Sequence, residues 1–324
     1  MTRVYITIDT EYSSGLVNGT GDADRADNFA RSIKGETASG AFGIAHKLAM
    51  FARYGIRASF FVDPMPALVW GTAAIEDIVG PILDAGQDVQ LHCHTEWLSH
   101  ARPGGPLARV GTGRCLYDFD CDAQTEILEF ARDTLVAAGA PRPVAFRAGN
   151  YGANDDTLRA LARLGLAYDT SHCPALGDGA SRISLGPDAR DPVHHCGVTE
   201  VPVGTIGTHG GGQRHAQITA LTLAEMTAAI RHAQANGRTC FTLVTHSFEL
   251  VNRRSRRENP IVRRRFDGLC RAIRMMPGVR SACYRDHPPA AEARKPAPPL
   301  PANPIRTGLR YAEQLVSNGL YGAT

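Results

Sequence analysis

The sequence predicts an α/β fold in which a parallel sheet with helical crossovers closes, or nearly closes, into a barrel. Two observations predict it. Short strand patterns alternate with helix patterns over most of the 324 residues. In addition, the polar side chains with the most obvious chemistry fall at the carboxyl ends of the predicted strands, which in an α/β barrel form the face that carries the active site.

The first predicted strand runs from Arg3 to Asp9, because apolar residues occupy every second position within it. It delivers a carboxylate to its carboxyl end. Residues 13–37 follow and are rich in Gly, Asp and Ser. They are expected to form a long loop, of the kind that is either functional or mobile in a compact domain.

Helices and strands then follow each other in turn. A helix that ends near Gly55 leads into the buried strand 57–62, and the same cycle recurs along the chain. Glycines or prolines stop the helices, and β-branched or aromatic residues are common in the strands. Further helices are expected at 75–85, 123–138, 155–164 and 223–236, and further strands at 88–92, 144–147, 166–169, 199–203 and 240–245.

The composition changes after His287, where proline and alanine become frequent. We expect a main domain over residues 1–287 and a Pro/Ala-rich C-terminal extension over residues 288–324. The extension is expected to wrap the surface or to link to the short amphipathic stretch 309–320.

Charge and hydrophobicity are those of an ordinary globular protein, with 43% hydrophobic and 21% charged residues. The formal net charge of only +3 gives no reason to expect a nucleic-acid partner. One basic stretch either binds a phosphorylated lipid or an anionic glycan or forms a solvated helix surface, and the second outcome is the more common. This stretch contains Arg253, Arg254, Arg256, Arg257, Arg263, Arg264 and Arg265.

The eight cysteines are scattered without a CxxC pair, so neither a zinc ribbon nor a thioredoxin-like motif is indicated. The N-terminus enters a strand pattern at once and lacks the basic region, apolar run and cleavage site of a signal peptide. We therefore expect reduced thiols and a cytoplasmic location. No stretch approaches the apolar length of a transmembrane segment.

Five polar residues mark the ends of predicted strands, and together they suit the hydrolysis of an unactivated amide. That reaction needs a water made nucleophilic, a positive centre for the oxyanion and an acid that protonates the leaving amine. Carboxylates, imidazoles and a guanidinium are candidates for these tasks. The five residues are Asp9, His92, Arg147, Asp169 and His246.

Five segments that contain these residues resemble, in order and approximate spacing, the motifs of the NodB-homology polysaccharide deacetylases, which are similar to carbohydrate esterase family 4. The segments are ITIDTEY (6–12), LHCHTEW (91–97), FRAGNYG (146–152), LAYDTSH (166–172) and TLVTHSF (242–248). The resemblance covers roughly residues 3–285. It implies a distorted (β/α) barrel of about seven parallel strands and a NodB-like catalytic domain over residues 1–287.

The resemblance implies that Asp9 is the general base for the attacking water, and that a divalent metal ion, with zinc favoured, lies beside it. Glu11 is expected to be the carboxylate ligand, with Asp9 as an alternative ligand. His92 matches the first histidine ligand of the family. The usual second histidine would fall at Glu96, so His94, which faces the same way as His92 in an extended segment, is expected to replace it.

In the third motif, the resemblance implies that Arg147 orients the catalytic carboxylate. It also implies that Tyr151 binds the substrate and that a backbone N–H near it helps to hold the oxyanion. Asp169 of the fourth motif is expected to pair with His246 of the fifth. His246 would then act as the general acid, because an imidazole held by a carboxylate stays protonated near neutral pH. Two further candidates, for the apolar wall that receives the acyl methyl group, are Trp97 and Leu243.

These expectations describe a hydrolase of linear amide C–N bonds, a sugar or polysaccharide N-deacetylase that removes an acetyl or formyl group from an amino sugar of a glycan or glycan precursor. Two alternatives stay open. An allantoinase-like cyclic amide hydrolase shares the fold and uses altered metal motifs. A catalytically silent carbohydrate-binding barrel would have lost the metal, but the presence of Asp9, Arg147 and His246 together argues against it.

Overall fold

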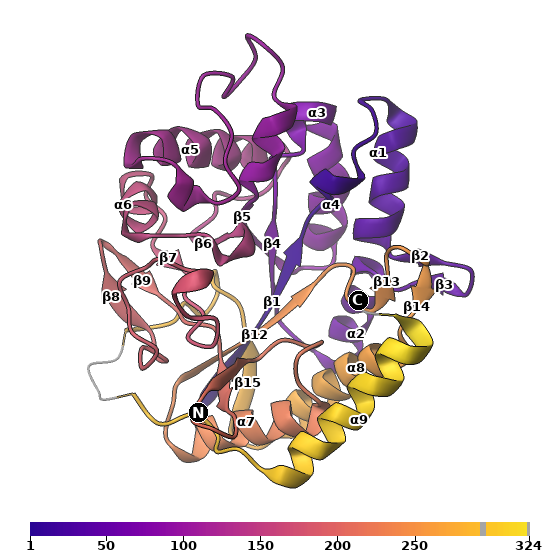
Figure 1. The fold of residues 1–324 in the computed structure, drawn as a ribbon, viewed down its shortest axis with the longest axis vertical. Coiled ribbons are helices and arrows are strands. Elements are labelled where there is room, and N and C mark those ends of the chain that lie inside the picture. Colours follow the sequence, from indigo (N-terminus) through magenta and orange to yellow (C-terminus); the bar gives the residue numbers. More distant parts are fainter. Residues whose placement is uncertain (292–295, 323–324) are drawn as a thin grey trace.

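The computed structural model describes residues 1–291 and 296–322, and its centre is a curled sheet with helices packed around it (Figure 1). The strands of this sheet are β1 (Thr2–Thr10), β4 (Ser59–Val62), β5 (Asp88–Cys93), β6 (Ala145–Ala148), β7 (Tyr168–Asp169), β8 (Val193–His195), β9 (Val198–Glu200), β12 (Cys240–His246) and β15 (Val279–Ala282).

The strands follow the order β12-β1-β4-β5-β6-β7-β9-β8, and β15 pairs with the first part of β1. Every pairing is parallel except that of β8 with β9. In the described part of the chain the end strands β12 and β8 do not pair with each other, so the sheet curls without closing. This curled, mostly parallel sheet confirms the predicted distorted (β/α) barrel.

Helices and small hairpins connect the strands. The helices are α1 (Asp22–Phe29), α2 (Ile44–Tyr54), α3 (Ala67–Trp70), α4 (Ala73–Asp84), α5 (Cys121–Ala137), α6 (Asp155–Arg163), α7 (Leu223–Ala235), α8 (Pro260–Met275) and α9 (Pro304–Tyr321). The hairpins are β2 (Glu36–Thr37) with β3 (Gly40–Ala41), β10 (Thr205–Gly207) with β11 (Gln213–His215), and β13 (Val251–Asn252) with β14 (Arg257–Glu258).

The predicted helices correspond to α2, α4, α5, α6 and α7, with ends that differ by a few residues. The expectation that residues 13–37 form one long loop is wrong. This segment contains α1 and a π-helical turn, Ala30–Lys34. Phe29 is the one large apolar residue of α1, so no apolar period was visible, whereas Asp22 and Asp24 favour the helix through their charge near its N-terminus.

Alternation along the strands separates two faces of the sheet. Ile6 and Ile8 of β1 belong to the main core beneath the helices, whereas Tyr5 packs inside the curl, in a small cluster that includes Phe61 and Tyr284. Asp9 has the same parity as Tyr5, so it too faces the inside of the curl. The apolar cluster therefore fills one end of the interior, and polar groups occupy the end where the strands terminate.

The chain after His287 returns to the main body, apart from residues 292–295, which lie outside the described part. The predicted stretch 309–320 lies within α9, which runs beside α7 and α8 (Figure 1). Arg310 of α9 binds Glu225 of α7 at 3.0 Å. Within the described residues, no helix is both long enough and apolar enough to span a bilayer.

Candidate active site

The carboxyl ends of the central strands surround a cavity of about 280 Å³. Strand register brings its walls together, because Asp9 lies opposite His246 in the β1–β12 pair and His92 lies opposite Arg147 in the β5–β6 pair. The cavity is lined by Asp9, Glu11, His92, His94, Ala148, Asn150, Tyr151 and His246. Six of the residues that the sequence predicted for the site are therefore in its wall.

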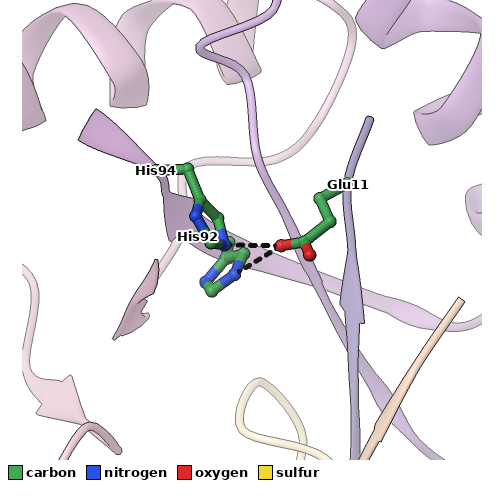
Figure 2. Close-up of side chains that lie close together, drawn as sticks. All are labelled: Glu11, His92 and His94. Atoms are coloured by element: carbon green, nitrogen blue, oxygen red, sulfur yellow. Dashed lines mark hydrogen bonds and ion pairs between the residues drawn. The ribbon is translucent and has the colours of Figure 1, made fainter. Parts of the chain in front are cut away.

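Three of these side chains converge as a group of metal-ligand type (Figure 2). Glu11 follows β1 directly, His92 belongs to β5, and His94 follows β5. Glu11 Oε2 lies 3.0 Å from His92 Nε2 and 2.7 Å from His94 Nε2. The predicted ligand set is thus brought together, whereas Glu96 is not part of the group.

Each histidine is oriented by a hydrogen-bond acceptor at its Nδ1, the ring nitrogen on the side away from Glu11, as is usual for metal ligands. His92 Nδ1 lies 2.7 Å from the carbonyl oxygen of Arg147, and His94 Nδ1 lies 3.1 Å from Glu96 Oε2. Each Nδ1–H can donate to its acceptor, which leaves the lone pair of Nε2 directed at the centre of the group. Two imidazoles and one carboxylate leave room for further ligands and suit zinc, so these residues fit the predicted ion.

The charges of this group support the same conclusion. Burial disfavours the charged form of Glu11, but the charge of His94 and the hydrogen bonds with both histidines outweigh it and hold the pKa of Glu11 well below its usual value. Burial also opposes protonation of His94. The carboxylates of Glu11, Glu96 and Asp63 prevail, and they raise the pKa of His94 well above its usual value. Such an anionic pocket attracts a cation.

Asp9 is held by a buried arginine. Its Oδ1 accepts a hydrogen bond of 2.7 Å from Arg147, which also donates to the hydroxyl of Thr7 at 2.8 Å and to the backbone and side chain of Thr170. Arg147 is 0% exposed, so all of its fixed donors serve this region. The guanidinium therefore positions the Asp9 carboxylate, as the sequence predicted.

The predicted pairing of Asp169 with His246 is wrong. Asp169 accepts hydrogen bonds from the backbone and hydroxyl of Ser171 and shares its buried surroundings with Glu200. Burial raises the pKa of Glu200 well above its usual value, and the neighbouring Asp169 raises it further. The charge of Arg147 acts on both carboxyl groups and opposes the rise of their pKa values.

Glu249 takes the place expected for Asp169. Its Oε1 lies 3.0 Å from His246 Nδ1, and its Oε2 accepts a hydrogen bond from the His246 backbone N–H. Burial alone would lower the pKa of His246, but Glu249 and then Asp9 raise it to about 9. The imidazolium in turn lowers the pKa of Glu249 to about 2, against the effect of burial. Gln217 donates to Glu249 and fixes its orientation.

Trp97 and Leu243 do not line the cavity, so the prediction that they receive the acyl group is wrong. Leu243 precedes His246 by three positions on β12 and therefore points to the opposite face, where it packs among core residues. Trp97 is 0% exposed and packs edge-on against Trp70 at 5.5 Å.

Tyr151 does line the cavity, and its position depends on unusual backbone geometry. Asn150 and Tyr151 have φ values of 55° and 57°, in the left-handed region that non-glycine residues rarely adopt. Asn150 is held there by its side chain, which donates a 2.6 Å hydrogen bond to Glu96. Among the described residues, the buried Tyr151 hydroxyl has no hydrogen-bond partner, so it is free to bind a ligand.

Sequence reasoning missed three polar residues of the site: Glu249, Gln217 and Asp63. Asp63 directly follows β4 and is 0% exposed, and burial raises its pKa to about 6. Asp63 lies at the end of a strand, as Asp9 does, so the same sequence pattern could have identified it as a site residue. Glu249 also had a local signal, three residues after His246. Gln217 had none, because only the fold brings it to Glu249.

Comparison with known proteins gives the fold but not the activity. No protein-family model and no curated protein matches the chain. A solved structure from Mycobacterium smegmatis, assigned as a polysaccharide deacetylase, is 18% identical over 94% of both chains, with a TM-score of 0.55. The α-amylase AmyC from Thermotoga maritima is 9% identical over 93% of this chain and 77% of its own, with a TM-score of 0.53. The chain therefore has the NodB-like fold of the polysaccharide deacetylases, whose motifs its sequence resembles.

Proposed function

We propose that this protein is a metal-dependent hydrolase that removes an N-acetyl group from an amino sugar. One observation carries the proposal: a metal-ligand group, an arginine-held carboxylate and a carboxylate-held imidazole line the same cavity. The likeness to a polysaccharide deacetylase structure supports it at the level of fold. An α-amylase with a similar fold shows that the site, and not the barrel, must decide the reaction.

The metal site would consist of Glu11, His92 and His94. The donor set favours zinc, and a divalent ion bound there would supply Lewis-acid chemistry for the amide carbonyl and the attacking water. The protein contributes the orientation of both imidazoles through Arg147 and Glu96.

Asp9 is the proposed general base. Arg147 occupies one of its oxygens, Oδ1, which leaves Oδ2 facing His246. A water that attacks the amide carbonyl beside the metal ligands would give its proton to this carboxylate.

His246 is the proposed general acid. Its Nδ1 is held by Glu249, and its Nε2 faces the cavity at 3.8 Å from Asp9 Oδ2. Because its pKa is raised to about 9, the ring carries a proton at neutral pH. That proton would pass from Nε2 to the departing sugar amine as the C–N bond breaks. The Tyr151 hydroxyl is the proposed donor to the bound substrate.

Asp169 acts indirectly in this scheme, through Thr170 and Arg147. Asp169 accepts a hydrogen bond from the backbone N–H of Ser171 and so fixes the segment that contains Thr170. Thr170 accepts a hydrogen bond from Arg147, and Arg147 in turn donates one to Asp9. Asp169 is therefore a positioning residue. The eight free thiols support the further proposal that the protein works in a reducing compartment such as the cytoplasm.

Three measurements test the proposal. Metal analysis of the purified protein should find one divalent ion per chain, and its absence would favour a silent carbohydrate-binding barrel. Acetate release from N-acetylglucosamine oligomers should require that ion. Ring opening of a cyclic ureide without acetate release would instead support an allantoinase-like hydrolase and contradict the proposal.

A further inference from the structure

We infer that a second cavity beside the active site binds an anionic group, a phosphate or a carboxylate, carried by the substrate. The inference rests on the proposed function, because it states which amino sugars the enzyme would prefer. The cavity measures about 440 Å³, within the range of small-molecule sites. We call it the arginine pocket, and it is lined by Ser13, Gly15, Leu16, Arg31, Arg253 and Arg254.

Segments far apart in the sequence build the arginine pocket. Ser13, Gly15 and Leu16 belong to the segment that leaves β1 just after Glu11, and Arg31 comes from the π-helical turn that follows α1. Arg253 and Arg254 lie in the turn between β13 and β14 (Figure 1). These segments follow the carboxyl ends of β1 and β12, the two strands that carry Asp9 and His246 into the active site.

One aromatic ring joins the arginine pocket to the active site. The Phe248 ring lies 5.2 Å from the His246 ring, centre to centre, at a shallow angle of 35°. The Arg253 guanidinium lies 3.6 Å from the centre of the same Phe248 ring. A substrate whose acetamido group reaches His246 would therefore place a neighbouring substituent near Arg253.

Arg253 is available for an anion. Among the described residues, no carboxylate lies within ion-pair distance of its guanidinium, which packs on the ring of Phe248. Burial lowers the pKa of Arg253, and the charge of Glu11 in the metal group opposes this effect. An arginine stays protonated even when partly buried, so this side chain offers unused N–H donors and a full charge.

The rest of the lining is also basic or uncharged. Arg254 has no ion-pair partner among the described residues, and Arg31 is held at 2.8 Å by Asp27, which lies outside the lining. None of the described residues that line the pocket is acidic. Guanidinium groups with free donors are the usual protein ligands for phosphate and carboxylate.

Other arginines of the same basic stretch differ from these two. Arg256 binds Asp27, Arg263 binds Glu258 and Asp267, and Arg265 binds Glu313. The stretch that the sequence marked as basic is thus divided by the fold. Some of its arginines serve structural ion pairs, and Arg253 and Arg254 face a cavity without a countercharge.

Calorimetric binding of reaction products tests the inference without turnover. Glucosamine 1-phosphate carries a phosphate, muramic acid carries a carboxylate, and glucosamine carries neither. We expect at least one of the two anionic compounds to bind about tenfold more tightly than glucosamine, since hydrogen bonds to charged groups are strong. Which one gains identifies the anion.

The double variant Arg253→Gln and Arg254→Gln should abolish this advantage, and circular dichroism would check its fold. Arg271→Gln, an exposed arginine of α8 away from the pocket, is the matched control and should keep the advantage. In the wild type, which requires no variant, added NaCl should reduce the advantage of the anionic compound over glucosamine, because the ammonium group is common to both. Equal binding of all three compounds would overturn the inference. The same holds if Arg271→Gln loses the affinity advantage of the anionic compound to the same extent as the double variant.

Activity separates this inference from the proposed function. If the wild type and the double variant release acetate equally well from neutral N-acetylglucosamine oligomers, while only the wild type prefers the acetylated anionic sugar, both stand. Acetate release with no preference for the anion would leave the function standing and remove the inference. If no amide is hydrolysed, the proposed function fails, while the calorimetric result still decides whether the pocket binds anions.

Discussion

Asp9 and His246 are register partners at the carboxyl ends of the parallel strands β1 and β12, and Asp9 Oδ2 lies 3.8 Å from His246 Nε2. Each is held on its far side by a group of opposite charge, Asp9 by Arg147 and His246 by Glu249. The two supports hold the Asp9 carboxylate beside an imidazole that carries a proton at neutral pH, because the pKa of His246 is raised to about 9. This arrangement suits a base and an acid that act on the same bond.

Replacement of Asp9 by Asn should remove the base and leave the metal site intact. We expect kcat to fall by about 10²- to 10⁴-fold, the usual contribution of a general base. Zinc affinity, measured by competitive titration, should change little because Asp9 is outside the ligand group. Glu11→Gln is the contrasting variant and should lose zinc. Parallel loss of zinc and turnover in Asp9→Asn would show instead that Asp9 is a ligand.

Substitutions at His94 and Glu96 should distinguish a ligand from its support. His94→Ala removes a ligand nitrogen, and we expect this variant to lose the most zinc affinity. Glu96→Ala removes the acceptor behind His94 Nδ1 but no ligand atom, and it should weaken zinc binding by about 10- to 100-fold. The reverse order of effects would mean that Glu96, at the position of the family's second histidine, is the ligand.

Zinc affinity should depend on pH through His94. The pKa of His94 is raised well above 6.5 in the metal-free protein, so zinc must displace a proton at neutral pH. Affinity should therefore rise by about a factor of ten per pH unit while His94 titrates. Glu11 adds no such dependence, because its pKa is held well below 4.5. Titrations at several pH values check this, and an affinity that stays constant from pH 6 to about 8 would contradict it.

Glu249→Gln should move the alkaline limb of the pH–rate profile to lower pH. His246 must be protonated to act as an acid, so activity is lost as the pH rises through its pKa, about 9. Without the Glu249 charge this limb should shift down by about 1 to 3 units. Glu76→Gln, an exposed glutamate of α4, is the control and should leave kcat/KM against pH unchanged.

The same pair should make stability depend on pH. The raised pKa of His246 stabilises the fold fully below about 6.5, and this contribution is lost as the pH rises through about 9. The lowered pKa of Glu249 contributes above about 4.5, and this contribution is lost as the pH falls through about 2. The difference in unfolding free energy between wild type and Glu249→Gln should therefore be largest between these limits, near pH 5 to 6. A difference that is independent of pH would contradict this.

Gly149→Ala should displace His94. A Cβ atom built on Gly149 would lie 2.7 Å from the His94 ring, closer than such contacts allow. We expect zinc affinity to fall by about tenfold or more, because ligand orientation is lost. Gly80→Ala is the matched control, since the space around Gly80 in α4 is open, and it should be neutral or stabilising. Unchanged zinc affinity in Gly149→Ala would show that His94 is not a ligand.

Local sequence patterns predicted the fold class and six of the residues that line the cavity. Alternating apolar residues placed Asp9, His92 and His246 at strand ends, and parallel strands collect such ends at one edge. The same alternation gave His92 and His94 a common direction. It also placed Leu243 and His246 on opposite faces of β12, so that error was avoidable from the sequence.

The partners of the catalytic groups were decided by the tertiary structure. Asp169 and Glu249 were both carboxylates near a motif, but only the fold shows that Glu249 reaches His246 while Asp169 meets Glu200.

The sequence by itself therefore determined which chemical groups this protein has at its strand ends, because the direction of a side chain follows from its position in a strand. Only the tertiary structure decided which residue is the hydrogen-bond partner of each catalytic group. It also decided that Arg253 faces a cavity and does not pair with a carboxylate. Those outcomes depend on distances between segments far apart in the chain, and no local pattern contains them.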